Sequence, residues 1–157
     1  MVKVDWHRRI PHPVLGAGVK PIRLFRGHAC ARRSLGVRIE RVDTWYRYEK
    51  GSEIIALPAT GREVYFITSG AVRVRIYSEA GRQVSFRDMD AGAIIGDIAA
   101  IDGAGRSTDI TALVESVLAA LLAAAFMLLL REQHVMYERY LSYLTGLIRL
   151  LTARVPP

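Results

Sequence analysis

Residues 64–77 read VYFITSGAVRVRIY and contain two strand-like segments joined by a tight turn. The first five residues are all β-branched or aromatic, which are the side chains most frequent in strands. After Ser69-Gly70, apolar and polar residues alternate through residues 72–77, as expected for a strand with one buried and one solvated face. This stretch therefore predicts a pair of β-strands near the middle of the chain.

Glycines punctuate the sequence on both sides of this stretch at an even spacing. They lie 9 to 11 residues apart, at Gly51, Gly61, Gly70, Gly81 and Gly92. Regular turn signals at this distance are typical of an all-β sandwich or barrel. Residues 78–81 predict a hairpin loop, and a further strand is predicted at residues 84–87. The pattern indicates an antiparallel meander.

The C-terminal part of the sequence changes from strands to helices. Two more strands are predicted at residues 109–113 and 116–121. From Leu122, apolar residues recur at helical spacing to about Gln133, and a second helix is predicted from about residue 135 to Thr152. Because strands come first and helices last, the sequence indicates one β-rich domain with terminal helices.

The loop from Gly92 to Thr108 holds the residues with the clearest chemistry. A short helix at residues 98–101 would direct unsatisfied N–H groups at an anion, and Gly96 would let the backbone come close. Arg106 can give two N–H donors to a phosphate, and Asp97 is an acceptor suited to a ribose hydroxyl. The loop therefore suits a small anionic sugar phosphate.

Residues 96–107, GDIAAIDGAGRS, resemble the phosphate-binding cassette of cyclic nucleotide-binding domains. The usual form of that cassette is F-G-E-[LI]-A-x-x, a short variable stretch, and then P-R-[SAT]-A. Residues 64–72 and 126–130 are similar to the same family, and the resemblance covers about residues 45–155. It implies a mainly β fold with C-terminal helices: an antiparallel, jelly-roll-like β-roll of about eight strands, a cassette helix and a long C-terminal lid helix.

The resemblance also implies roles for individual residues. Arg106 is expected to pair with the cyclic phosphate and Asp97 to bind the ribose 2′-hydroxyl. The residue that faces the adenine is expected near the end of the last helix, close to Leu151 or Thr152. Ser107 in place of threonine favours cAMP over cGMP as the ligand, and no other cofactor is implied. The expected ligand-binding residues are Gly96, Asp97, Ile98, Ala99, Arg106, Ser107, Thr108 and Thr152.

The sequence departs from the family pattern at three positions. Asp97 replaces the usual glutamate, Gly105 replaces the proline before the arginine, and Asp109 adds a carboxylate close to the expected phosphate. A carboxylate near a phosphate is unfavourable unless it faces away. These departures leave a second hypothesis open, in which the roll no longer binds nucleotide and serves as an interaction or dimerisation module.

The sequence does not indicate an enzyme. His7, His12, His28 and His134 show no metal-ligand spacing, whereas a metal-dependent jelly-roll enzyme of the cupin type would need histidines clustered on strands. Ser69 and Ser107 have no histidine or carboxylate arranged as a base in sequence, so a nucleophilic site is not expected either. We therefore expect a ligand sensor with neither a catalytic residue nor a metal.

Positive charge is concentrated in residues 1–41, which hold ten lysines and arginines against two acidic residues, whereas the rest of the chain is nearly neutral. We expect residues 1–44 to form a basic, partly irregular N-terminal arm and residues 45–157 to form the cyclic nucleotide-binding domain. Residues 37–42 are a candidate entering strand. The simplest interpretation of the arm is a solvated tail, with contact to nucleic acid or an acidic membrane as the alternative.

Location and assembly follow from the same sequence. The longest apolar run, residues 117–130, is too short to span a bilayer, no secretory signal is evident, and Cys30 is a single cysteine, so we expect a cytoplasmic protein. The chain stops at Pro157 without room for a helix-turn-helix, so direct DNA binding is not expected. The apolar stripe of the last helix predicts a homodimer, with that helix passing the signal to an unidentified partner protein.

Overall fold

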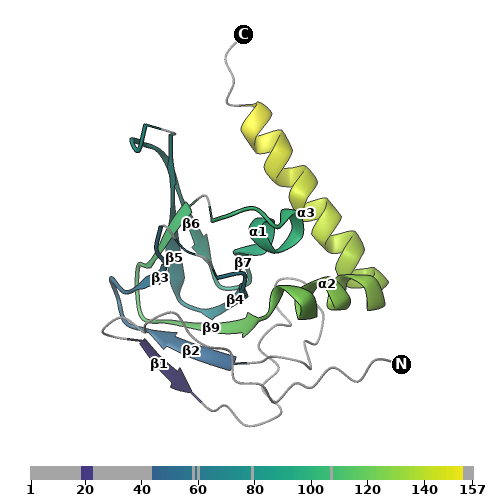
Figure 1. The fold of residues 1–157 in the computed structure, drawn as a ribbon, viewed down its shortest axis with the longest axis horizontal. Coiled ribbons are helices and arrows are strands. Elements are labelled where there is room, and N and C mark those ends of the chain that lie inside the picture. Colours follow the sequence, from purple (N-terminus) through teal and green to yellow (C-terminus); the bar gives the residue numbers. More distant parts are fainter. Residues whose placement is uncertain are drawn as a thin grey trace.

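The computed structural model describes residues 19–22, 44–57, 59, 61–78, 80–106 and 108–153 (Figure 1). The strands are β1 Val19–Ile22, β2 Thr44–Tyr48, β3 Glu53–Ile55, β4 Val64–Ser69, β5 Ala71–Tyr77, β6 Gln83–Asp90, β7 Ile94–Ile95, β8 Thr108–Ala112 and β9 Ser116–Leu121. The helices are α1 Asp97–Asp102, α2 Ala123–Glu132 and α3 His134–Thr152. The predicted order of strands first and helices last is confirmed.

The strands form two antiparallel sheets that face each other. One sheet has the order β1-β2-β9-β4-β7 and the other has the order β3-β8-β5-β6. The two sheets remain open at their edges and do not close into a barrel. The eight strands β2 to β9 form the predicted jelly-roll-like β-roll with C-terminal helices, and β1 adds one more strand beside β2.

Strand β4 lies inside its sheet and is buried on both faces. Val64 and Phe66 belong to the apolar cluster beneath the helices, whereas Tyr65 and Ile67 belong to the cluster between the two sheets. A strand covered on both faces needs apolar residues without alternation. This explains why residues 64–67 are continuously apolar, while the next strand alternates.

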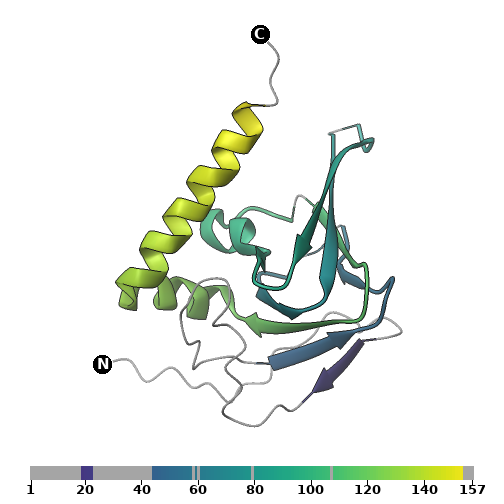
Figure 2. The same ribbon diagram turned by 180° about the vertical axis from the view of Figure 1, so that it is seen from behind.

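Strands β5 and β6 form the predicted hairpin, which extends away from the rest of the roll (Figure 2). Gly81 in its turn has a φ of 72°, a left-handed conformation that favours glycine. Arg73 and Asp88 are direct cross-strand partners, joined by two hydrogen bonds of 2.7 and 2.8 Å on the exposed face. The alternation places Val72 and Val74 on the inner face and Arg73 on the outer face, whereas Ile76, farther along the hairpin, is exposed.

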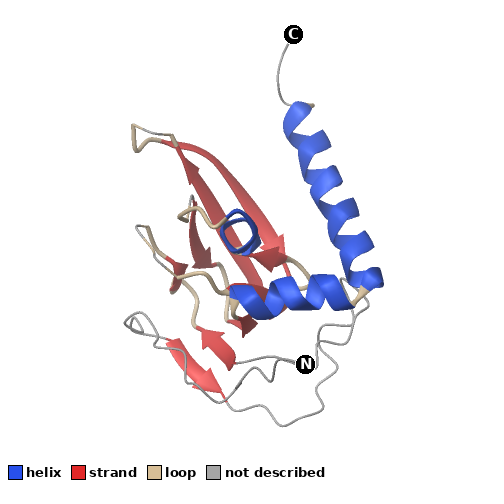
Figure 3. Cartoon of the chain, turned by 45° about the vertical axis from the view of Figure 1, so that its right-hand side comes forward, coloured by secondary structure: helices blue, strands red, loops and turns tan. Residues whose placement is uncertain are grey.

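The two C-terminal helices cover the outer face of the five-stranded sheet near β4 and β9. Phe126 of α2 is completely buried and its ring lies 6.2 Å from that of Phe66, centroid to centroid. After the single non-helical residue Gln133, α3 takes a different direction and runs away from the roll (Figure 3). Met136 and Tyr140 bury the first turns of α3 in the same cluster. Beyond Tyr140, the α3 residues whose side chains are described are half-buried or exposed.

The expected N-terminal arm is partly ordered into the sheet. Within residues 1–44, β1 pairs with β2 so that Ile22 lies opposite Trp45. The candidate entering strand at residues 37–42 lies outside the described residues. The boundary expected at residue 45 falls inside β2, because the aromatic segment Thr44–Tyr48 is itself a strand paired with β9.

Candidate functional site

The loop between β7 and β8 folds as a short helix followed by a bend. Helix α1 begins directly after Gly96 and lies between the roll and α3 (Figure 1). Ala99 is buried, and Ala100 packs against the cluster beneath the helices. These two alanines pack α1 against the domain, whereas Ile98 and Ile101 of the same turn are exposed.

Gly96 occupies a position that only glycine fits without strain. Its φ of 78° is left-handed, and a Cβ built on it would collide with the guanidinium of Arg106 and come within 2.7 Å of the carbonyl oxygen of Glu63. The missing side chain lets Arg106 lie directly against the backbone.

The side chain of Arg106 is buried, with 4% of it exposed, whereas the residue as a whole is half-buried. Its Nη1 donates to the carbonyl oxygen of Gly96 at 2.8 Å, and its Nη2 donates to the carbonyl oxygen of Glu63 at 2.7 Å. Burial lowers the pKa of Arg106, and the nearby Tyr65, Glu63 and Asp97 raise it. A buried guanidinium in a fixed orientation is suited to binding an anion.

Glu63 is a part of the site that the sequence did not reveal. It lies directly before β4, is buried, and brings its carboxylate Oε2 to 3.7 Å from Nη2 of Arg106. Gly61 provides the space for this carboxylate, because a Cβ at that position would collide with Oε2. No spacing in the sequence connects residue 63 to residue 106, so the pairing depends on the fold.

Asp97 is buried, with 6% of its surface exposed, and its carboxylate is hydrogen-bonded to Tyr140 of α3. The hydroxyl of Tyr140 donates to its Oδ2 at 2.5 Å. Burial raises the pKa of Asp97, and this is opposed by the Tyr140 bond, by the backbone N–H groups of Asp97 and Ile98, and by the charge of Arg106. Burial and the bond to Asp97 also raise the pKa of Tyr140. Asp97 thus links the cassette to the last helix.

The structure brings Gly96, Asp97 and Arg106 together, buries Ala99 in α1, and places the other expected residues differently. Ile98 is 57% exposed, and Ser107 lies outside the described residues. Thr152 is the exposed last residue of α3, and the C-terminal end of that helix lies away from α1 in each view (Figures 1–3). Its hydroxyl donates to the carbonyl oxygen of Ile148 at 3.1 Å.

The start of β8 separates two residues that were expected near the phosphate. Thr108 lies on the same face of the strand as the buried Ile110, toward the interior of the roll. Asp109 lies on the opposite face, where its carboxylate accepts a hydrogen bond of 2.8 Å from the N–H of Leu57. The extra carboxylate therefore faces away from Arg106.

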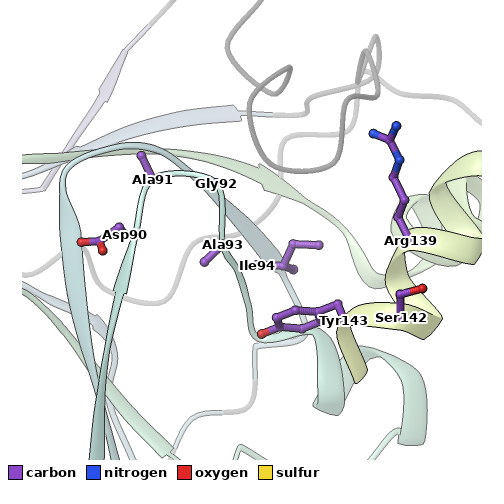
Figure 4. Close-up of a pocket in the computed structure, with 8 residues that line it drawn as sticks. All are labelled: Asp90, Ala91, Gly92, Ala93, Ile94, Arg139, Ser142 and Tyr143. Carbon is purple, nitrogen blue, oxygen red and sulfur yellow. The ribbon is translucent and has the colours of Figure 1, made fainter. Parts of the chain in front are cut away.

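An open cleft of about 580 Å³ separates α3 from the turn between β6 and β7. Residues 90–94 line one side, and three residues of α3 line the other: Arg139, Ser142 and Tyr143. Figure 4 shows Tyr143 pointing from α3 into this cleft, toward Ala93 and Ile94. The cleft lies beside the part of α3 that follows Tyr140, where the helix has little burial.

Within the described part of the chain, no three histidine, cysteine, aspartate or glutamate side chains come together as a metal site. Of the helices in the same residues, none has the length and hydropathy required to cross a bilayer.

Comparison with known structures supports the architecture. The catabolite activator protein of Thermus thermophilus is 21% identical, with a TM-score of 0.62 over 69% of this chain and 51% of that one. A cyclic nucleotide-binding domain from Methylobacillus flagellatus is 27% identical, with a TM-score of 0.53 over 71% and 61% of the two chains. A cAMP-binding acyltransferase from Mycobacterium smegmatis is 24% identical, with a TM-score of 0.54 over 60% and 29%.

In each of these three cases the matched region spans less than two thirds of the other protein. No curated protein sequence matches the chain. The sequence model of the cyclic nucleotide-binding domain matches residues 45–133, which is more than half of the chain and includes the whole cassette. The chain therefore belongs to the cyclic nucleotide-binding domain family.

Proposed function

We propose that this protein is a regulatory, non-enzymatic sensor that binds a cyclic nucleotide, cAMP in preference to cGMP, in the cytoplasm. The observation that carries the proposal is the buried guanidinium of Arg106, held against Gly96 at the start of α1. An arginine placed for structure alone is usually solvated, whereas burying a guanidinium costs free energy that an anionic ligand would offset.

In the proposed complex, the cyclic phosphate binds Arg106. Two of the five N–H donors of the guanidinium are committed to the carbonyl oxygens of Gly96 and Glu63, which fixes its orientation. The remaining donors would bind the phosphate, and the backbone N–H of Ala99 in α1 would add to them. The carboxylate of Asp97, close to Arg106, would accept a hydrogen bond from the ribose 2′-hydroxyl.

Helix α3 would carry the signal through Tyr140. The ribose hydroxyl and the Tyr140 hydroxyl would share one carboxylate, so nucleotide binding would weaken or break the bond that holds α3 against α1. The single non-helical residue Gln133 and the cleft beside Tyr143 leave room for α3 to move. Ligand binding would thus shift the population of α3 positions.

A Tyr140→Phe variant tests this link. Loss of the hydroxyl should lower the free energy of unfolding by about 1.5–3 kcal/mol, the usual contribution of a hydrogen bond to a charged group. The ring remains, so its edge-to-face packing 5.5 Å from Phe126 is kept. Hydrogen exchange should show α3 already less protected without nucleotide, with no further change when cAMP is added.

Tyr143→Phe is the matched control, because Tyr143 lies on the same helix, is half-buried and packs its ring 6.1 Å from that of Tyr140. Its exchange response to cAMP should equal that of the wild type. An unaltered response of α3 to cAMP in Tyr140→Phe would show that Asp97 and Tyr140 do not carry the signal.

Helix α3 is also the proposed surface for homodimer formation. Exposed or half-buried apolar residues follow a spacing of four, three and four, at Tyr137, Leu141, Leu144 and Ile148. This is the spacing of a two-stranded coiled-coil seam, and a second copy of the chain would supply the matching stripe. Sedimentation of the full chain would give twice its mass.

The function itself is tested by the thermal stability of the full chain with millimolar cAMP, cGMP or adenosine. A ligand that binds the folded state raises the melting temperature, whereas adenosine lacks the phosphate and should have little effect. An unchanged melting temperature with both cyclic nucleotides would favour the second hypothesis, a roll that serves as an interaction module.

A further inference from the structure

Glu63 is placed beside Arg106 without being needed to hold it. The guanidinium is fixed by two short hydrogen bonds to the backbone, one of them to the carbonyl oxygen of Glu63 itself. The Glu63 carboxylate lies farther away, at 3.7 Å from Nη2, which is beyond ordinary hydrogen-bond distance. What this side chain adds to the site is therefore mainly its negative charge.

The position of this charge is well defined. The Glu63 side chain is 11% exposed, and Gly61 leaves the space that its carboxylate fills. Asp97 contributes a second carboxyl group, close enough to Arg106 to influence its pKa. The site thus combines one guanidinium with two carboxyl groups, and the positive charge of Arg106 is already opposed before an anion arrives.

We propose that Glu63 is a specificity-determining residue that selects a singly charged phosphodiester over a doubly charged phosphomonoester. This inference rests on the proposed function, because it concerns the ligand that Arg106 binds. A cyclic phosphate carries one negative charge, whereas a nucleoside monophosphate carries between 1.5 and about 2 at neutral pH. The repulsion from Glu63 grows with ligand charge, so the monoester is disfavoured more strongly.

The direct test is calorimetric titration of the Glu63→Gln variant with cAMP and with 5′-AMP at constant ionic strength. Glutamine keeps the length of the side chain and leaves the carbonyl oxygen that orients Arg106. Removing one charge a few ångströms from the phosphate should tighten cAMP binding about tenfold. The effect on 5′-AMP should approach a hundredfold, so the preference for cAMP over 5′-AMP should fall about tenfold.

Glu53→Gln is the matched control, because it removes the same charge from an exposed position on β3. Its affinities for both nucleotides should stay within twofold of the wild type. Wild-type protein provides a measurement that needs no variant: it should bind cAMP more tightly than 5′-AMP.

Each other outcome has a distinct meaning. An unchanged preference between cAMP and 5′-AMP in Glu63→Gln, or weaker binding of both, would overturn the selective role while leaving the proposed function intact. Equal binding of the two nucleotides by the wild-type chain would overturn it as well. Absence of cAMP binding by wild type and variant alike would overturn the proposed function and this inference with it.

Discussion

An Arg106→Ala variant is expected to bind cAMP at least about thirtyfold more weakly than the wild-type chain. Truncating one partner of a buried, hydrogen-bonded charge pair costs roughly 2–5 kcal/mol of binding free energy. In the proposed complex Arg106 forms such a pair with the phosphate, because its side chain is 4% exposed and its guanidinium is oriented by the carbonyl oxygens of Gly96 and Glu63.

The same substitution should also destabilise the fold. It removes the donor for two carbonyl oxygens and leaves the carboxylate of Glu63 buried without the cation beside it. We expect a loss of about 3 kcal/mol in the free energy of unfolding, the lower end of what breaking a buried ion pair costs. Denaturant unfolding measures this loss, and calorimetry at a temperature where the variant is folded measures the affinity.

Arg62→Ala is the control for this prediction. Arg62 is exposed, and its Nη2 donates to the carbonyl oxygen of Gly103 at 3.2 Å, at the other end of α1. Its removal should change stability by less than about 0.5 kcal/mol, as for most surface substitutions. Equal cAMP affinity in Arg106→Ala and Arg62→Ala would show that the buried arginine does not bind the phosphate.

A Gly96→Ala variant is expected to lose both stability and nucleotide binding. The left-handed backbone costs a non-glycine residue about 1–2 kcal/mol, and the new methyl group would collide with the guanidinium of Arg106. Overpacking of this kind typically adds 1–3 kcal/mol. We therefore expect a total loss of roughly 2–5 kcal/mol, together with a displaced Arg106 and weaker binding of cAMP.

A Gly103→Ala variant separates the cost of the left-handed backbone from the effect of the collision with Arg106. Gly103 ends the same helix with a φ of 72°, and a Cβ built there meets nothing within 4 Å. This variant should show the backbone cost alone, about 1–2 kcal/mol, and should bind cAMP as the wild type does. Equal losses of binding in the two variants would mean that the contact between Gly96 and Arg106 does not matter for the ligand.

The parts of the fold that the sequence predicted are those with a strong local pattern. Residues 64–69 are rich in strand-forming side chains, residues 71–77 alternate, and the two C-terminal helices have apolar residues at helical spacing; each of these elements appears in the structure. Strands β3 and β7 have three and two residues, which is too short for any period to be recognised.

Strands β1 and β2 were missed for other reasons. The segment that forms β1 contains Pro21, and a proline weakens a strand prediction. Thr44–Tyr48 spans the boundary between the expected arm and the expected domain, so the sequence does not predict a strand there. Both segments become strands by pairing with a segment distant in sequence. Strand β2 pairs with β9, and β1 pairs with the other edge of β2.

The candidate site, like the fold, could be predicted only where its residues lie close together in the sequence. The cassette residues are close together in sequence, so Gly96, Asp97 and Arg106 could be identified from their order and spacing. Their partners Glu63 and Tyr140 each lie 43 residues away and are brought in by β4 and α3. Tyr140 could be placed on the apolar stripe of the last helix, but its hydroxyl partner depends on how α3 packs against α1.

Calorimetric titration of the full-length chain with cAMP tests the central claim most directly. We predict saturable binding of one cAMP per chain, weaker binding of cGMP, and loss of the signal in Arg106→Ala but not in Arg62→Ala. No heat of binding up to millimolar cAMP and cGMP, with the wild-type chain shown to be folded by its cooperative unfolding, would contradict the account.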